Sequence, residues 1–199
     1  NTYLQTIKDN EVKENQNGLL LGENYGGRTI SGNEISENKS LALYVGYNND
    51  NLVQIIDNKI NSNGGHGIRF YNSMNGNMEV KGNEIKDNKG DGFWNTERIS
   101  KNLVFEDNVI ENNSGYGVYF SRIQGNVLIQ DNVVKKNRYS GIYVEKSNDQ
   151  STEIKIKDNV VSENKQGNET HDNNGITLYY QSSATAQITG NTAEDGGGY

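Results

Sequence analysis

Residues 80–93 read "VKGNEIKDNKGDGF" and contain the features that recur in the unit from which the chain is built. One apolar residue, Val80, lies three positions before Asn83, and another, Ile85, lies two positions after it. A second Asn comes five positions after the first, and a Gly opens the next apolar stretch. Short alternating apolar stretches separated by Asn and Gly are typical of β-strands joined by tight turns, and no stretch is long enough to favour a helix.

This unit recurs about every 25 residues. Its leading Asn falls at Asn10, Asn33, Asn58, Asn83, Asn108, Asn132, Asn159 and Asn191. A unit of this size cannot bury its apolar residues alone, so consecutive units should stack as coils of a parallel β-solenoid, with equivalent residues ~4.8 Å apart. The sequence therefore predicts an all-β solenoid of about eight coils, with residues 1–199 as a single domain. Because the chain begins inside one predicted strand and ends where another should begin, we expect a segment of a longer solenoid without its polar caps.

The composition fits a narrow core made by repetition. The chain has 33 Asn and 23 Gly, no Pro and no Cys, and only 32% of its residues are hydrophobic. The absence of Cys excludes disulfides and thiolate metal sites. No apolar run approaches the roughly 18 residues of a membrane span. A net charge of -7, with dispersed Lys and Arg, argues against nucleic acid as a partner.

Two Asn columns are predicted to be structural. The first should form an internal ladder, in which side-chain amides bond from coil to coil at a turn where Asn tolerates left-handed backbone geometry. The second column should occupy the next turn for the same backbone reason. Its members are Asn15, Asn38, Asn63, Asn88, Asn113, Asn137 and Asn164.

The pattern "IxDNxIxxN", followed by "GIxF", resembles the repeat of a known class over essentially the whole chain. That class is the right-handed single-stranded parallel β-helix of pectate-lyase-like, carbohydrate-binding proteins and sugar hydrolases. Within it, the chain is most similar to alginate lyases and mannuronan C5-epimerases. The resemblance implies a right-handed parallel β-helix. It does not by itself fix the function, because the same scaffold carries lyases, epimerases, hydrolases, phage tailspikes and adhesins.

The outward positions of the Gly-led strands form a column rich in aromatic residues. The column reads Leu20, Tyr44, Arg69, Trp94, Tyr119, Tyr143 and Thr177. Sugar rings stack on aromatic faces, and cations neutralise uronate carboxylates, so this column could bind a polysaccharide. The predicted substrate-binding residues are Tyr44, Trp94, Tyr119, Tyr143, Arg122, Glu145 and Lys146. The alternative is a purely structural ladder in which the aromatic residues stack on one another.

A candidate catalytic group lies beside this column. Stacking should place His66, Asp91 and Tyr116 in three successive coils next to Arg69. A cation that neutralises a carboxylate, a His or Tyr base and a Tyr acid suit the abstraction of the C5 proton of a uronate. The grouping is similar to the epimerase motif Tyr-x-x-Asp-Pro-His, followed one coil later by Asp-Gly-Phe.

The match to that motif covers only part of it. His66 and Asp91 agree in type and spacing, whereas Asn61 and Gly64 replace the Tyr and the first Asp, and there is no Pro. Tyr116 as proton donor comes from this sequence alone. The alternative is that these are ordinary turn residues, since His, Asp and Asn often precede Gly for backbone reasons.

An insertion between Asn164 and Gly175, "KQGNETHDNN", offers a second candidate site. Glu169, His171 and Asp172 could overhang the column or supply oxygen ligands to Ca²⁺, although their spacing is not that of a known calcium loop. A solvated loop is the alternative. No metal site is assigned and no cofactor is predicted.

Three functions follow from these observations. The first is a secreted or cell-surface protein that recognises an acidic polysaccharide and processes it as a lyase or C5-epimerase. Glycoside hydrolysis is less well supported, because no outward column of the Gly-led strands has carboxylates in adjacent coils. The second is a noncatalytic carbohydrate-binding module. The third is the structural shaft of an adhesin, surface-layer or phage fibre protein.

Overall fold

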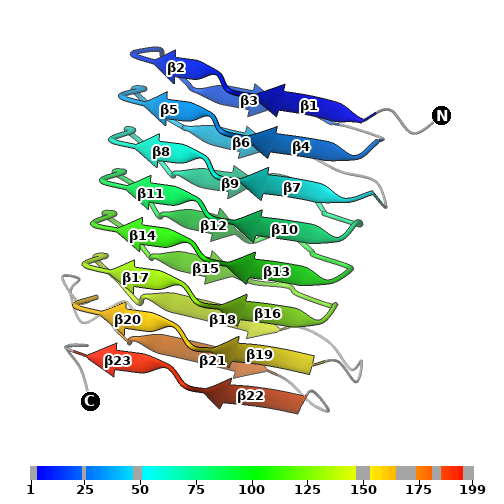
Figure 1. Ribbon diagram of the computed structural model, residues 1–199, viewed down its shortest axis with the longest axis vertical. Helices are drawn as coiled ribbons and strands as arrows, with labels where there is room; N and C mark the ends of the chain where they lie inside the picture. The colour runs from blue at the N-terminus through cyan, green and yellow to red at the C-terminus, as the bar shows by residue number, and fades with distance from the viewer. Residues whose placement is uncertain are drawn as a thin grey trace.

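The computed structural model describes residues 4–23, 26–46, 51–146, 153–164, 174–180 and 185–194. In these ranges every regular element is a β-strand, so none of them contains a helix that could cross a membrane. The strands stack into three parallel sheets that wind as a right-handed solenoid along the long axis of the molecule (Figure 1). The predicted fold class, a right-handed parallel β-helix, is confirmed.

Each of the first seven coils contributes one strand to each sheet, and in the described residues the last coil contributes strands to the first two sheets only. The first sheet contains β1 (Gln5–Lys8), β4 (Arg28–Ser31), β7 (Val53–Ile56), β10 (Met78–Lys81), β13 (Leu103–Glu106), β16 (Val127–Gln130), β19 (Glu153–Lys157) and β22 (Thr185–Thr189). The second contains β2 (Glu11–Lys13), β5 (Glu34–Ser36), β8 (Lys59–Asn61), β11 (Glu84–Lys86), β14 (Val109–Glu111), β17 (Val133–Lys135), β20 (Val160–Ser162) and β23 (Thr192–Glu194). The third contains β3 (Leu19–Leu21), β6 (Leu43–Val45), β9 (Ile68–Phe70), β12 (Phe93–Asn95), β15 (Val118–Phe120), β18 (Ile142–Lys146) and β21 (Ile176–Tyr180).

Strand register follows the sequence repeat. Val80 of β10 pairs with Ile55 of β7 and with Phe105 of β13. In the second sheet Ile85 pairs with Ile60 on one side and with Ile110 on the other. All of these side chains are fully buried, so the predicted apolar columns are the core of the solenoid.

The core is one residue deep from each sheet, and its aromatic residues meet near the middle of the molecule. Phe93 makes edge contacts with Phe70 and Phe105, both at 5.3 Å between ring centroids. It also lies 4.8 Å from Phe120. Toward the last coil burial decreases, and Ile188 of β22 is 51% exposed although it occupies the same column as the buried Phe105. The middle coils therefore contribute most of the hydrophobic stabilisation, about 1.5–3 kcal/mol for each large side chain removed from water.

Both Asn columns form hydrogen-bonded ladders. The Nδ2 of Asn83 donates to the Oδ1 of Asn108 at 2.9 Å, and the backbone N–H of Asn83 donates to the same oxygen at 3.0 Å. Asn88 makes the same two bonds to Asn113, both at 3.1 Å. The predicted internal ladder is confirmed, and the second column is a ladder as well, not only a set of turn residues.

The residue that takes the left-handed conformation is not the ladder Asn, so this part of the prediction is wrong. Among the described residues, positive φ angles of 53 to 67° occur at the position just before each ladder Asn. At the first turn these residues are Asp9, Gly32, Asp57, Gly82, Asp107, Asp131, Asp158 and Gly190. The Asn side chain instead points inward, where its amide bonds to the next coil satisfy backbone groups that would otherwise be buried without partners.

One inward position departs from the apolar pattern. Arg28 pairs with Val53, yet its guanidinium is 1% exposed. Its Nε donates to Gln5 and its Nη2 to the carbonyl of Gly22, both at 2.8 Å, while Nη1 has no partner. Burial lowers the pKa of Arg28, because it disfavours the charged form.

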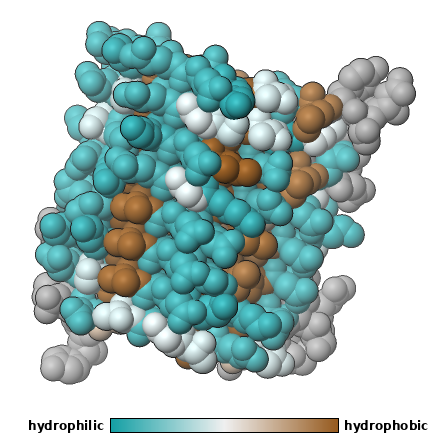
Figure 2. Space-filling model, viewed as in Figure 1, coloured by the Kyte–Doolittle hydropathy of each residue, from teal (hydrophilic) through white to brown (hydrophobic). Residues whose placement is uncertain are grey.

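The outer surface of the first two sheets is mostly hydrophilic (Figure 2). Hydrophobic side chains gather over β14, β17 and β20, where Val109, Val133 and Val160 stand in register. The third sheet lies on the far side in this view, and it carries the predicted site.

Candidate functional site

The outward column of the third sheet has the predicted register. Trp94 of β12 pairs with Arg69 of β9 and with Tyr119 of β15, and Tyr119 pairs with Tyr143 of β18. The Trp94 and Tyr119 rings stack at 4.4 Å and 22°, and the Tyr119 and Tyr143 rings stack at 4.8 Å and 7°. Parallel strands hold equivalent residues one strand spacing apart, which is also the distance at which flat rings stack.

This stacking changes how the column can contact a ligand. Both faces of the Tyr119 ring are covered, one by Trp94 and the other by Tyr143. The expectation that sugar rings stack on exposed aromatic faces is therefore wrong at Tyr119. Its ring edge faces outward, and ring edges carry the positive part of the aromatic quadrupole.

His66 extends the stack at the turn that precedes β9. Its imidazole lies parallel to Trp94, at 5.5 Å and 15°. Its Nδ1 lies 2.9 Å from the Oδ2 of Asp91 in the next coil. His66 is half-buried, with 24% of its side chain exposed, while only 8% of the Asp91 side chain is exposed. A buried carboxylate therefore orients a partly exposed imidazole.

Asp91 is held from both sides. Its Oδ1 accepts a hydrogen bond of 2.5 Å from the backbone N–H of Tyr116, one coil further along. Two glycines make room for the pair, because a Cβ atom at Gly90 would crowd the His66 ring and one at Gly115 would overlap Asp91 Oδ1. The structure thus brings His66, Asp91 and Tyr116 together in successive coils, as the sequence predicts.

The position of the proton on His66 follows from its two contacts. Nδ1 also lies 3.1 Å from the backbone N–H of Asp91, and it cannot accept from that group while donating to the carboxylate. The charge-assisted bond to Oδ2 is the stronger of the two, and we place the proton on Nδ1. Nε2 then keeps its lone pair, and no partner of Nε2 is recorded within the described part of the chain.

Arg69 stands between Tyr44 and Trp94 in the column. Its Nε is buried and has no hydrogen-bond partner, and no ion pair joins the guanidinium to a carboxylate of the described residues. Burial raises the pKa of Tyr44, the neighbouring Tyr71 raises it further, and the positive charge of Arg69 opposes both. Among the described residues, Arg69 is thus a cation without a carboxylate partner, and it pairs with Trp94, on which His66 stacks.

The ring of Tyr116 lies in a cluster of tyrosines. Its centroid is 5.1 Å from that of Tyr119, 5.3 Å from that of Tyr139 and 5.8 Å from that of Tyr143. The contact of Tyr116 with Asp91 is made by its backbone N–H, and its ring contacts the column through Tyr119 and Tyr143. Tyr139 was not predicted from the sequence. It comes just before Ser140, which occupies the position of Tyr116 in the next coil, and this place could have indicated it.

Comparison with known proteins gives one match. The family described as "right handed beta helix region" matches the chain over residues 1–152 and again over residues 54–193. The chain belongs to this family. No curated protein and no solved structure matches the chain significantly.

Three predicted substrate-binding residues of this β-helix family member have no contact with the His66–Asp91 pair among those the structure describes. Arg122 is exposed in the turn after β15, with a left-handed φ of 56°, and no side-chain contact with the column is recorded. Glu145 of β18 is half-buried and pairs with Tyr179. Lys146 ends the same strand, and its side chain is outside the described set.

The insertion that carries Glu169, His171 and Asp172 lies outside the described residues. Within the described ranges, no group of three His, Asp or Glu residues could hold a metal ion. The predicted Ca²⁺ alternative falls on the insertion and stays a prediction.

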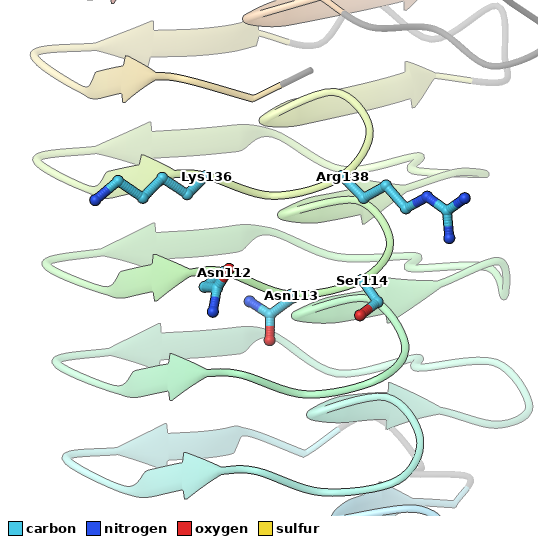
Figure 3. A pocket seen from close by; sticks show the side chains of 5 residues that line it. All are labelled: Asn112, Asn113, Ser114, Lys136 and Arg138. Carbon is cyan, nitrogen blue, oxygen red and sulfur yellow. The ribbon is translucent and has the colours of Figure 1, made fainter. Parts of the chain in front are cut away.

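A polar hollow of about 320 Å³ lies at the turns around Asn113 (Figure 3). It is lined by Asn112, Asn113, Ser114, Lys136 and Arg138. Lys136 and Arg138 point away from one another, and Lys136 lies 3.8 Å from Glu111. The two cations do not converge on a common ligand, so the third sheet remains the better candidate.

Proposed function

We propose that this protein is an extracellular β-helix that recognises an acidic polysaccharide along the outward face of its third sheet. The observation that carries the proposal is Arg69, a cation in the aromatic column that forms no ion pair with a carboxylate of the described residues. Its Nε is buried, so a ligand carboxylate would bond to the terminal amino groups of the guanidinium, and such charge-assisted bonds are stronger than neutral ones.

The surroundings of Arg69 fit the same ligand. The stacked rings of Trp94, Tyr119 and Tyr143 present their positively polarised edges, which suit the oxygens of a carboxylate or hydroxyl group. The ring spacing of 4.4 to 4.8 Å repeats along the column, as sugar units repeat along an extended polymer. Membership of the β-helix family favours a carbohydrate-related or a structural role, which is coarser than this proposal.

The first experiment measures binding. Trp94 is the only tryptophan, so its fluorescence should report ligands on this face in titrations with alginate, pectate and an uncharged polysaccharide. We expect the acidic polymers to bind and Arg69→Gln to weaken them about tenfold or more, since hydrogen bonds to a charged group contribute about 1.5–3 kcal/mol.

Lys59→Gln provides the matched control, because Lys59 is an exposed cation on β8 of the second sheet. The control should bind like the wild type. Equal weakening by both substitutions would show that only net charge matters, and binding of the uncharged polymer alone would exclude recognition through Arg69.

The finer proposal is chemical. With its proton on Nδ1, His66 offers Nε2 as a base for the C5 proton of a uronate, and Arg69 neutralises the charge that develops on the adjacent carboxylate. Return of a proton to the other face gives the C5 epimer. Cleavage of the C4–O bond, with a proton passed to the leaving oxygen, gives an unsaturated product, and Tyr116 is the candidate donor.

These two outcomes can be measured separately. Ultraviolet absorbance of the unsaturated product detects the lyase, and uptake of deuterium from solvent at C5 detects the epimerase. We expect Asp91→Asn and His66→Ala to abolish either activity while polymer binding persists. Absence of both signals with a polymer that the wild-type protein binds would leave a noncatalytic carbohydrate-binding module.

The stack itself favours a second candidate, a structural shaft. Rings whose faces cover one another stabilise a sheet without any ligand, by about 0.5–1.5 kcal/mol per pair. If this is the role of the column, Trp94→Ala lowers stability and the wild-type protein binds none of the polymers, a result that would overturn the first proposal.

A further inference from the structure

The outward face of the third sheet changes character at its N-terminal end. One coil before Arg69 the surface is hollowed, with a volume of about 520 Å³. The hollow is lined by Asn17, Leu20, Gly22, Leu41 and Tyr44. None of these residues carries a charge at neutral pH, and Leu20 is 53% exposed within it.

Two glycines explain why the surface is hollow at this point. Gly22 follows β3, and a Cβ atom placed on it would meet no atom of the described residues within 4 Å. Gly46 follows β6 and lies against the backbone of Gly22, so it adds no side chain either. In the next coil the equivalent position is Tyr71, whose ring stacks on Tyr44 at 5.6 Å. The glycines thus leave space beside Leu20 and Tyr44 that larger residues fill elsewhere.

The hollow and the Arg69 site are continuous. Tyr44 lines the hollow and pairs directly with Arg69, which lies one strand spacing further along the column. A polymer held by Arg69 would therefore extend over the hollow. Carboxylates gain no charge partner from this lining, in which Asn17 is the one amide, whereas Leu20, Leu41 and the Tyr44 ring remove a small apolar substituent from water.

We propose that this hollow binds the methyl group of an ester carried by the polysaccharide, either an O-acetyl group or the methyl ester of a uronate. The inference rests on the proposed function, because it takes the same polymer on the same face. The protein would then recognise a partly esterified acidic polymer, with a free carboxylate at Arg69 and an ester group next to it.

The test compares matched polymers by Trp94 fluorescence titration. One pair is alginate with and without chemical O-acetylation, and the other is pectin of intermediate methyl esterification against fully de-esterified pectate. We expect one esterified member to bind about fourfold more tightly than its partner, the gain for one buried methyl group. The pair that shows the difference identifies the ester.

Two variants assign the preference to the hollow. Leu20→Ser removes apolar lining at an exposed position, and Gly22→Leu fills the open space; each should abolish the preference and leave affinity for the de-esterified polymer unchanged. Leu52→Ser, at another exposed Leu just before β7, is the control and should keep the preference.

The outcomes separate the two proposals. Binding of acidic polymers without any preference, or a preference that survives in both hollow variants, overturns the ester site alone. Failure of every acidic polymer to bind the wild-type protein overturns the proposed function and the ester site together.

Discussion

The two Asn ladders and the outward face of the third sheet are made by the same coils. The ladders repeat one residue type from coil to coil, whereas the residues of the outward face change. In the first ladder every described coil supplies an Asn, and the bonds between them stay within 2.8 to 3.0 Å. Along the outward face the residue type changes from coil to coil, from Leu20 through Arg69 to the tyrosines of the later coils.

The difference shows where the fold constrains the sequence. A ladder position is buried and must satisfy the same backbone groups in every coil, so only one residue type fits it. An outward position needs only to tolerate a strand, so its residues are available for other roles. A residue that departs from the repeat therefore points to a function when it lies on the outer surface, and lowers the stability of the fold when it lies in the interior.

The largest expected effect comes from breaking a ladder. Asn108→Ala removes the Oδ1 that accepts the backbone N–H and the Nδ2 of Asn83, and the Nδ2 that donates to Val80 and Asn132. Asn108 is fully buried, so water cannot replace these partners. We expect the free energy of unfolding to fall by about 3–5 kcal/mol, measured by urea denaturation.

Asn112→Gly is the matched control. Asn112 is exposed and has a φ of 56°, which Gly adopts easily, and its side-chain amide donates to Asp87. The control should change stability by less than about 1 kcal/mol. A similar loss in both variants would mean that the ladder contributes no more than a surface turn.

The repeat made most of the fold predictable. Eight similar units with apolar columns leave few alternatives to a parallel solenoid, and strand register follows once the Asn residues are aligned. The error concerned the turns. An Asn in a turn suggests a left-handed residue, but the sequence does not reveal that the inward-facing side chain has a stronger requirement, which leaves the left-handed position to Asp107 or Gly82.

The site was predictable in its neighbours but not in its orientations. Column alignment is enough to bring His66 to Asp91 and Trp94 to Tyr119. It cannot show that ring faces cover one another, because side-chain torsions are not encoded in the repeat. Nor did it reveal Asn95, which points inward among apolar residues with its Oδ1 unpartnered.

An intermediate effect is expected where the interior departs from the repeat. Arg28→Met should raise the free energy of unfolding by about 1–3 kcal/mol, because it replaces a buried charge that has no carboxylate partner among the described residues. The substitution restores the pattern of the column, where Val53 and Met78 follow. Urea denaturation at neutral pH measures it.

Arg98→Met is the control for this substitution, since Arg98 is exposed. It should leave stability within about 0.5 kcal/mol of the wild type. A loss of stability in Arg28→Met alone would show that the bonds of Arg28 to Gln5 and Gly22 outweigh the burial of its charge.

The smallest effect is expected on the outward face and depends on pH. Burial raises the pKa of Tyr44 above its unfolded value of about 10, so the folded protein keeps a proton that the unfolded chain releases. The stability that this gives is present below about pH 10 and is lost as the pH rises through the folded pKa. Tyr44→Phe should therefore gain stability relative to the wild type between about pH 9 and about pH 11 in urea denaturation.

One comparison sharpens this last prediction. In an Arg69→Gln background the gain from Tyr44→Phe should increase, because the cation that opposes the rise in the Tyr44 pKa is gone. If the gain in stability from Tyr44→Phe is unchanged in this background, Arg69 does not act on Tyr44. The unneutralised charge on which the polysaccharide proposal rests would then not lie beside the Tyr44 ring.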